Sequence, residues 1–185
     1  MNFSREELWD LGKAWVLVTI AFHLVFRFPL NPVSFLLTGV VVGGAVILHE
    51  IGHKYVAERY GYEASFVSND LMLVLGVFMA VTGFIFIAPG AVHVRGLRDK
   101  QRNAIIAWAG PAVNALLALV AYLLIGIANA SSYFTLVLRV NAILGAFNLI
   151  PVGGFDGQKI WAGDRRLYIG SVIVLGMLAG AAFSL

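Results

Sequence analysis

Two histidines and one glutamate, His49, Glu50 and His53, form an H-E-x-x-H pattern inside a long apolar stretch of the chain. Residues four apart lie on the same face of an α-helix, so the two imidazole rings can bind one metal ion. Glu50 then lies beside the metal without binding it, where a carboxylate can take a proton from an activated water molecule and return it to a leaving amine. The pattern therefore predicts a hydrolytic zinc site that holds one ion per chain.

A third metal ligand is needed, and Asp156 is the best candidate. The chain contains no cysteine, so nitrogen and oxygen atoms must hold the zinc ion. Asp156 belongs to a segment, residues 147–157, in which one proline and three glycines must interrupt any helix. Unwound backbone at membrane depth is tolerated only where protein buries it or where it lines a wet cavity. Two histidines and one carboxylate form the ligand set of a catalytic zinc site, and His93 is the next candidate for the third ligand.

The composition indicates that these residues lie in a membrane protein. Of the 185 residues, 60% are hydrophobic and only 12% are charged, whereas soluble domains carry a charge on about a quarter of their residues. Each membrane-spanning helix needs about 20 residues, so the chain has room for about five of them. We therefore expect an all-α polytopic membrane protein that forms one domain, residues 1–185, and we expect no nucleic-acid partner.

Polar or proline-containing turns separate the expected spans, which are residues 14–28, 33–53, 104–128, 133–150 and 167–183. His23 in the first span is interpreted as a packing or interfacial residue, because no partner at ligand spacing accompanies it. Asn114 in the third span is expected either to form an interhelical hydrogen bond or to belong to the site. Arg139 and Asn141 in the fourth span are expected to face protein or the membrane interface.

The segment between the second and third spans, residues 71–88, is uncharged and long enough to cross a membrane. It is also rich in valine, phenylalanine, isoleucine and threonine and contains two glycines, which suits a pair of strands or a re-entrant loop. A single crossing would separate Asp156 from the histidines by the bilayer thickness, about 30 Å. We therefore expect a re-entrant or β-hairpin insert. Most of the 13 lysines and arginines then lie on one face, so the positive-inside rule predicts a cytoplasmic N-terminus and a cytoplasmic active-site face.

Three motifs together resemble those of the site-2 protease family of intramembrane zinc metalloproteases. They are His-Glu-Ile-Gly-His at 49–53, Gly-Pro-Ala-Val-Asn at 110–114, and Asn-Leu-Ile-Pro at 148–151 followed by Asp-Gly at 156–157. In this order and spacing they cover the family's three-helix core, from about residue 33 to residue 157. The chain is similar to a compact member of the family, because we expect no room in it for a PDZ domain.

The resemblance implies cleavage of transmembrane or membrane-anchored proteins within or near the lipid bilayer. It also implies residue roles: the zinc ligands are His49, His53 and Asp156, the general base is Glu50, and the groups that hold substrate or polarise the scissile carbonyl are Asn114 and Asn148. A transmembrane substrate must unwind locally before a peptide bond is exposed. An exposed strand of the enzyme could hold the unwound segment by β-addition.

The sequence leaves two other functions open. A membrane metal-ion transporter or sensor could use the same two histidines and aspartate, but it gains nothing from an unligated carboxylate beside the first histidine, whereas hydrolysis requires one. An inactive relative that binds transmembrane helices need not retain every ligand and the base. Glu50 and the intact motifs therefore favour the protease.

Overall fold

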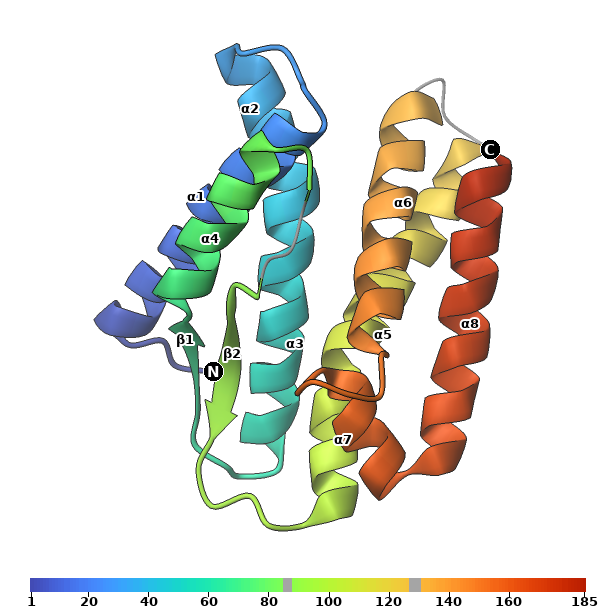
Figure 1. Cartoon of the computed structure of the whole chain (residues 1–185). Coiled ribbons are helices and arrows are strands. Elements are labelled where there is room, and N and C mark those ends of the chain that lie inside the picture. Colours follow the sequence, from blue (N-terminus) through green and yellow to red (C-terminus); the bar gives the residue numbers. More distant parts are fainter. Residues whose placement is uncertain (85–87, 127–130) are drawn as a thin grey trace.

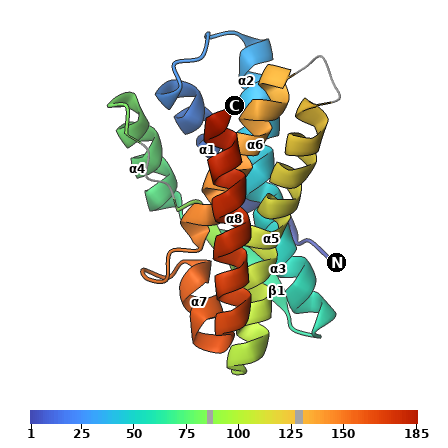
Figure 2. The same cartoon turned by 90° about the vertical axis from the view of Figure 1, so that its right-hand side faces the viewer.

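The computed structural model describes residues 1–84, 88–126 and 131–185, and it consists mainly of helices (Figure 1). In chain order the elements are α1 (Arg5–Val25), α2 (Pro32–Thr38), a π-helical turn (Gly39–Gly43), α3 (Gly44–Arg59), β1 (Ala64–Ser68), α4 (Asp70–Val81), β2 (Gly90–Val94), α5 (Lys100–Ile125), α6 (Ser131–Asn148), α7 (Asp156–Gly163) and α8 (Arg165–Ser184). In Figure 1, α1, α4 and the strands lie on one side of α3, and α6 and α8 lie on the other. Figure 2 shows α8 in front, with α4 at the outer edge. Because α5 contacts α3, α6, α7 and α8, it joins the two sides.

Polar side chains define where three of the long helices begin. Ser4, Asp99 and Asp164 precede α1, α5 and α8, and each side chain accepts a hydrogen bond from a backbone amide of the first turn. Such caps satisfy amides that have no partner within the helix, and each typically contributes about 1 kcal/mol. The polar residues that flank the apolar segments therefore fix the starts of these helices.

Four helices of the described residues are long and apolar enough to cross a membrane, namely Arg5–Val25, Pro32–Arg59, Lys100–Ile125 and Arg165–Ser184. The second of these combines α2, the π-helical turn and α3. These four helices support the prediction that the chain is an integral membrane protein. The sequence predicted a fifth span at residues 133–150, which corresponds to α6. That helix is not among the four, so the fifth span stays a prediction.

The insert between the second and third spans differs from the expectation. Strands β1 and β2 pair antiparallel, with Ser68 opposite Gly90, and therefore lie on either side of residues 71–88 rather than within them. Residues 70–81 form α4 instead, because the Asn69 side chain caps its first turn by accepting from the Met72 amide. Residues 85–87 of the insert lie outside the described residues. The prediction of β-strands is therefore wrong for residues 71–81, which are helical. The pairing of Ser68 with Gly90 shows that the chain reverses between these residues, as expected.

The core lies in two clusters, one on each side of α3 and α5. The first joins α1, α3 and α4 through residues such as Leu11, Val18, Val46 and Leu73. The second joins α5, α6, α7 and α8 through Ala107, Ala118, Leu138, Ile160 and Leu175. Small residues on α5 let the neighbouring helices approach closely. The helix that carries the histidines and the segment that carries Asp156 are thereby packed against the same helix, α5.

A buried ion pair joins α1 and β1 to the helix that carries the histidines. Lys54 Nζ lies 3.0 Å from Glu7 Oε2, and both side chains are almost fully buried. Lys54 also donates to the Ala64 carbonyl at 2.6 Å, and the other oxygen of Glu7 accepts from the Phe66 amide at 2.9 Å. Because Lys54 directly follows His53, these contacts hold three elements together beside the site.

Candidate metal centre

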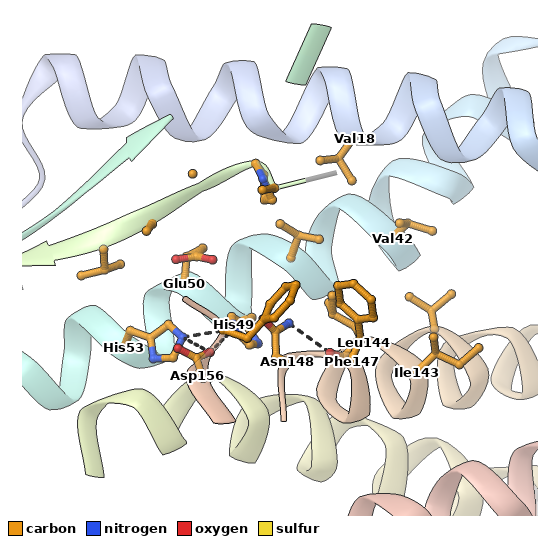
Figure 3. Close-up of a pocket in the computed structure, with 18 of the residues that line it drawn as sticks. Val18, Val42, His49, Glu50, His53, Ile143, Leu144, Phe147, Asn148 and Asp156 are labelled. Atoms are coloured by element: carbon orange, nitrogen blue, oxygen red, sulfur yellow. Dashed lines mark hydrogen bonds and ion pairs between the residues drawn. The ribbon is translucent and has the colours of Figure 1, made fainter. Parts of the chain in front are cut away.

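His49 and His53 of α3 and Asp156, the first residue of α7, form the one group of potential metal ligands among the residues that the structure describes. The Nε2 atoms of the two histidines lie 3.1 Å apart, and Asp156 Oδ2 lies 3.2 Å from His49 Nε2 and 3.1 Å from His53 Nε2. All three side chains are buried, and Figure 3 shows them directed toward one another. The structure thus brings together the three predicted ligands, although Asp156 follows His49 by 107 residues.

The hydrogen bonds of the two rings indicate which nitrogens are free for a metal ion. His53 Nδ1 lies 2.8 Å from the Ile106 carbonyl, and a carbonyl oxygen can only accept, so Nδ1 carries the proton. His49 Nδ1 lies 2.6 Å from Asn114 Oδ1, which is likewise an acceptor. In neutral imidazoles both Nε2 atoms are then unprotonated, and they face each other and the Asp156 carboxylate. Three lone pairs at these distances repel one another unless a cation lies between them, so the arrangement fits a bound metal ion.

The spacing of the three atoms suits zinc. Zinc binds nitrogen and oxygen ligands at about 2.0–2.2 Å, and a tetrahedral arrangement places neighbouring ligand atoms about 3.3–3.6 Å apart. The three separations here, 3.1, 3.1 and 3.2 Å, are close to that value. Two histidines and one carboxylate leave a fourth position for water, as in catalytic zinc sites. The cluster is therefore compatible with one zinc ion.

The charge state of Asp156 also suits a metal ligand. The nearby ammonium group of Lys159 favours the ionised form of the Asp156 carboxyl group. The oxygen that faces away from the histidines, Oδ1, lies 3.3 Å from Lys159 Nζ. Since metal ligands must be deprotonated, the carboxylate is ready to bind.

Asn114 lies behind His49 and orients its ring. The side chain is fully buried, and its Nδ2 donates to Asn141 Oδ1 at 3.0 Å and to the Ala45 carbonyl at 3.4 Å. Asn141 Nδ2 in turn donates to the Val137 carbonyl at 2.9 Å. Because backbone carbonyls can only accept, they determine which end of each amide faces which partner. This relay leaves Asn114 Oδ1 to accept from His49 Nδ1, so His49 Nε2 points into the site.

Gly110 of α5 leaves room for the two histidines. A Cβ atom at this position would lie closer than 3.0 Å to Nε2 of both His49 and His53, nearer than real Cβ atoms approach other groups. Any side chain would therefore intrude on the ligand atoms. In the motif at 110–114, the glycine thus leaves space for the two histidine rings, and Asn114 orients the ring of His49.

Glu50 lies beside the cluster but does not belong to it. It lines a cavity of 730 Å³ together with His49, His53 and Asp156, and Figure 3 shows it next to His49. Its carboxyl group lies near the backbone amide of Val92 in β2. The Glu50 side chain therefore borders the same cavity as the three candidate metal ligands.

The two predicted substrate-binding asparagines occupy different positions. Asn148, the last residue of α6, lines the cavity, and its Nδ2 donates to the Leu144 carbonyl at 3.0 Å (Figure 3). Asn114, in contrast, is not among the residues that line the cavity. Asn148 therefore borders the cavity, whereas Asn114 lies behind His49.

The remaining histidines lie apart from the cluster. His93 is exposed on β2 and is not part of the group that contains Asp156. His23 is buried, with Nδ1 3.1 Å from Thr38 Oγ1 and Nε2 3.2 Å from the Pro29 carbonyl. These contacts agree with the interpretation of His23 as a packing residue, and Asp156 rather than His93 accompanies the histidine pair.

Sequence reasoning did not connect Asn141 to the site or identify the contribution of Gly110. Asn141 carried a signal, because a polar residue within an apolar span is usually functional or buried against protein. Its partner could not be read, since that depends on how α5 and α6 are rotated against each other. Gly110 carried no signal apart from the motif to which it belongs.

The model of the family described as Peptidase family M50 matches residues 37–130. A Methanocaldococcus jannaschii protein named "Putative zinc metalloprotease" is 33% identical over 166 residues, which cover 86% of this chain and 85% of that protein. A Bacillus subtilis protein with the same description is 24% identical over 72% of this chain and 70% of its own length. A "Zinc metalloprotease" of Methanocaldococcus jannaschii is 32% identical over 63% of this chain and 30% of its own length. No solved structure matches the chain.

Proposed function

Because this chain belongs to peptidase family M50, the family of the site-2 proteases, we propose that it is an intramembrane zinc metalloprotease. It hydrolyses peptide bonds of transmembrane or membrane-anchored proteins within or near the bilayer, and residues 33–157 form the core of its single domain. One observation carries this proposal. Three convergent acceptor atoms border the same cavity as an unligated carboxylate, Glu50. Glu50 and the two histidines belong to a helix long and apolar enough to span a membrane.

His49, His53 and Asp156 would hold the zinc ion. When bound, the ion supplies a Lewis acid that polarises the scissile carbonyl and lowers the pKa of water toward neutrality. The relay through Asn114 keeps the His49 ring in the tautomer that binds metal, and the Ile106 carbonyl does the same for His53. The contacts of each ligand thus leave its binding atom directed at the same point.

Glu50 acts as the general base. Its carboxylate accepts a proton from the attacking water and then transfers that proton to the leaving amine nitrogen, so the same group serves both halves of the reaction. It lies in the apolar cavity rather than in bulk water, where its contact with a substrate would be screened less. A transport or sensing site has no need of this carboxylate.

Asn148 contacts the substrate, because it is the asparagine that lines the cavity. One N–H of its Nδ2 group bonds to the Leu144 carbonyl, and the second donates to the substrate carbonyl as negative charge develops on the oxygen. For Asn114 the burial and the bond to His49 favour orientation of the ligand over contact with substrate. We therefore assign the two asparagines different roles.

Strand β2 offers a place to hold the unwound substrate. It pairs with β1 along one edge, and residues of β2 including Gly90, Ala91 and Val92 line the cavity. An extended peptide that adds to the other edge of β2 would have its backbone amides satisfied in an apolar setting. That position would place its carbonyl groups beside Glu50.

The membrane orientation follows from the distribution of charge. We propose that the N-terminus and the face that carries Lys54, Lys159 and the connector at 95–102 are cytoplasmic, as the positive-inside rule predicts. The cluster lies near the end of the second span, which runs from Pro32 to Arg59. Water from the cytoplasm would then reach the site over a short path.

Purified protein in detergent or liposomes, incubated with a transmembrane reporter substrate, tests this proposal. Cleavage should stop when a zinc chelator is added and return when zinc is restored. Cleavage that continues after complete removal of zinc would contradict the metalloprotease assignment. Zinc-dependent transport into sealed vesicles without cleavage would instead support the transporter.

A further inference from the structure

Arg139 lines the cavity far from the metal cluster. It lies on α6, and residues 139 to 148 of a helix rise about 14 Å, so Arg139 is well separated from Asn148 although both line the same cavity. The cavity wall around this end is otherwise apolar, with Phe22, Phe26, Phe28, Leu136 and Phe183. The guanidinium group of Arg139 therefore lies among aromatic and aliphatic side chains.

Most of the hydrogen-bond donors of Arg139 have no partner among the residues that the structure describes. Nε donates to the Ala182 carbonyl at 2.9 Å, near the C-terminal end of α8. The two Nη groups carry the other four N–H donors of the guanidinium, and they form no hydrogen bond or ion pair with any described residue. Every fully buried side-chain nitrogen and oxygen in the described part of the chain has a partner. The Nη groups are thus not sealed in protein, and they border the open cavity.

No carboxylate of the described residues forms an ion pair with Arg139. The acidic residues that line the cavity, Glu50 and Asp156, belong to its metal end. Residues 85–87 and 127–130 contain neither aspartate nor glutamate. The contact with Ala182 needs only a neutral N–H donor and does not explain a positive charge. An ionisable group inside the membrane is costly unless it is paired, so the missing partner is expected to come from outside the chain.

We propose that Arg139 forms a carboxylate-binding subsite for the membrane segment of the substrate. The inference rests on the proposed protease function and names one determinant of its specificity. A glutamate or aspartate in the substrate helix would be matched by the planar guanidinium through two parallel hydrogen bonds. The occupant is the substrate rather than a lipid phosphate, because the same cavity contains Arg139 and the metal ligands.

The separation between Arg139 and Asn148, the residue that we place at the scissile bond, predicts where the acidic residue of the substrate lies. A separation of about 14 Å corresponds to about nine residues of helix or about four residues of extended chain. The substrate is extended at the scissile bond and helical away from it. Its acidic residue therefore lies between four and nine residues from that bond.

Reporter substrates that differ only in the placement of one glutamate test the subsite. Glutamate is moved from position three to position ten relative to the scissile bond, and each substrate has a glutamine counterpart. For wild-type protein, kcat/KM should be about tenfold higher with glutamate at one or two neighbouring positions, mainly through a lower KM. Arg139→Gln should reduce this ratio to about one, and Arg139→Lys should retain part of it. Arg166→Gln, which changes an exposed arginine outside the cavity, should keep the full ratio.

Two outcomes separate this inference from the proposed function. If wild-type protein cleaves the substrates with a glutamate-to-glutamine ratio near one at every position, the subsite is wrong and the protease assignment stands. If no substrate is cleaved, the protease assignment fails, and the subsite is tested by titrating fluorescent glutamate and glutamine peptides into the Glu50→Gln variant. Equal affinities for the two peptides at every position would then overturn the subsite as well.

Discussion

At the scale of single residues, the site depends on the groups that aim the ligands as much as on the ligands. His49 Nδ1 faces Asn114, Asn114 is held by Asn141, and Asn141 donates to a backbone carbonyl. Each amide has its orientation fixed by the next. A substitution of Asn141 should therefore change the affinity of the site for the metal ion.

Asn141→Ala should weaken zinc binding about 10-fold to 100-fold, since Asn114 would be free to turn and present its Nδ2 to His49. The dissociation constant measured by competition with a chelator checks this. Ser171→Ala is the matched control, because it removes a buried hydroxyl that bonds only within α8. Equal zinc affinity in both variants would exclude a positioning role for Asn141.

Gly110→Ala should also impair zinc binding, by at least about tenfold. At an ordinary interior helix position the same change stabilises a protein by up to about 1 kcal/mol, but here the methyl group would overlap Nε2 of both histidines. Gly170→Ala on α8 adds a methyl group where no atom lies within 4 Å and serves as the control. Zinc content by mass spectrometry or atomic absorption distinguishes the two variants, and full zinc occupancy in Gly110→Ala would refute the clearance argument.

The site residues could be predicted from the sequence to an unequal degree. His49, Glu50 and His53 follow from a local pattern on one helix, and Asp156 follows from an acid in a helix break at membrane depth. The contact between Asn114 and Asn141 could not be predicted, because it depends on the relative rotation of α5 and α6. The same holds for the apolar surroundings of Arg139, which come from α1, α6 and α8.

At the scale of elements, α4 and the two strands form a unit that leaves α3 and returns to it. The register from Ala64↔Val94 to Ser68↔Gly90 holds the two ends of the insert together. The sequence predicted the reversal from the need to bring Asp156 to the histidines. It did not predict α4, because an apolar run rich in β-branched residues suits strands and helices alike.

Asp70→Cys and Arg95→Cys should both be labelled by an impermeant thiol reagent from the same side of oriented vesicles. Asp70 begins α4 and Arg95 follows β2 directly. Residues 69–89 leave and re-enter the ladder at its Ser68–Gly90 end, and Arg95 lies beyond the opposite, Ala64–Val94 end, so the expected common side follows from the net reversal of this insert. The wild-type chain has no cysteine and is the unlabelled control. Labelling from opposite sides would contradict both the reversal and the assembly of the metal ligands in a membrane.

Glu7→Ala should lower the free energy of unfolding by about 3 kcal/mol, because it removes the buried carboxylate that pairs with Lys54 and leaves only the more exposed Glu58, at 3.1 Å, as an acidic partner. The measurement is unfolding in mixed detergent micelles. Glu63→Ala is the matched control, since it breaks an ion pair whose side chains are 80% and 85% exposed, and exposed pairs contribute little. If both variants were equally stable, the contacts of Lys54 would not hold α1 and β1 to α3.

At the scale of the whole molecule, the outer surface is suited to lipid. Only 17% of the apolar window of α8 is buried within the chain, and Ile169, Val172, Ile173 and Met177 are exposed along it. An apolar surface of this kind on a soluble monomer would lead to association. The composition alone predicted this environment, and four helices of the described residues are long and apolar enough to use it.

The whole molecule also brings together the parts that the proposed intramembrane reaction needs. Helix α5 packs against both α3 and α7, so ligands from distant parts of the chain meet in one buried site. The cavity at that site extends from the ligands to an apolar end between α1, α6 and α8. The central claim is that Glu50 performs proton transfer there without contributing to metal binding.

Zinc content and cleavage measured on the same preparation of Glu50→Gln test that claim most directly. The amide cannot accept a proton, whereas His49, His53 and Asp156 are unchanged, so we expect one zinc ion per chain and a loss of cleavage of at least about 1000-fold. Asp156→Ala, in contrast, should lose zinc together with activity. Cleavage by Glu50→Gln at close to the wild-type rate, with zinc bound, would contradict the account.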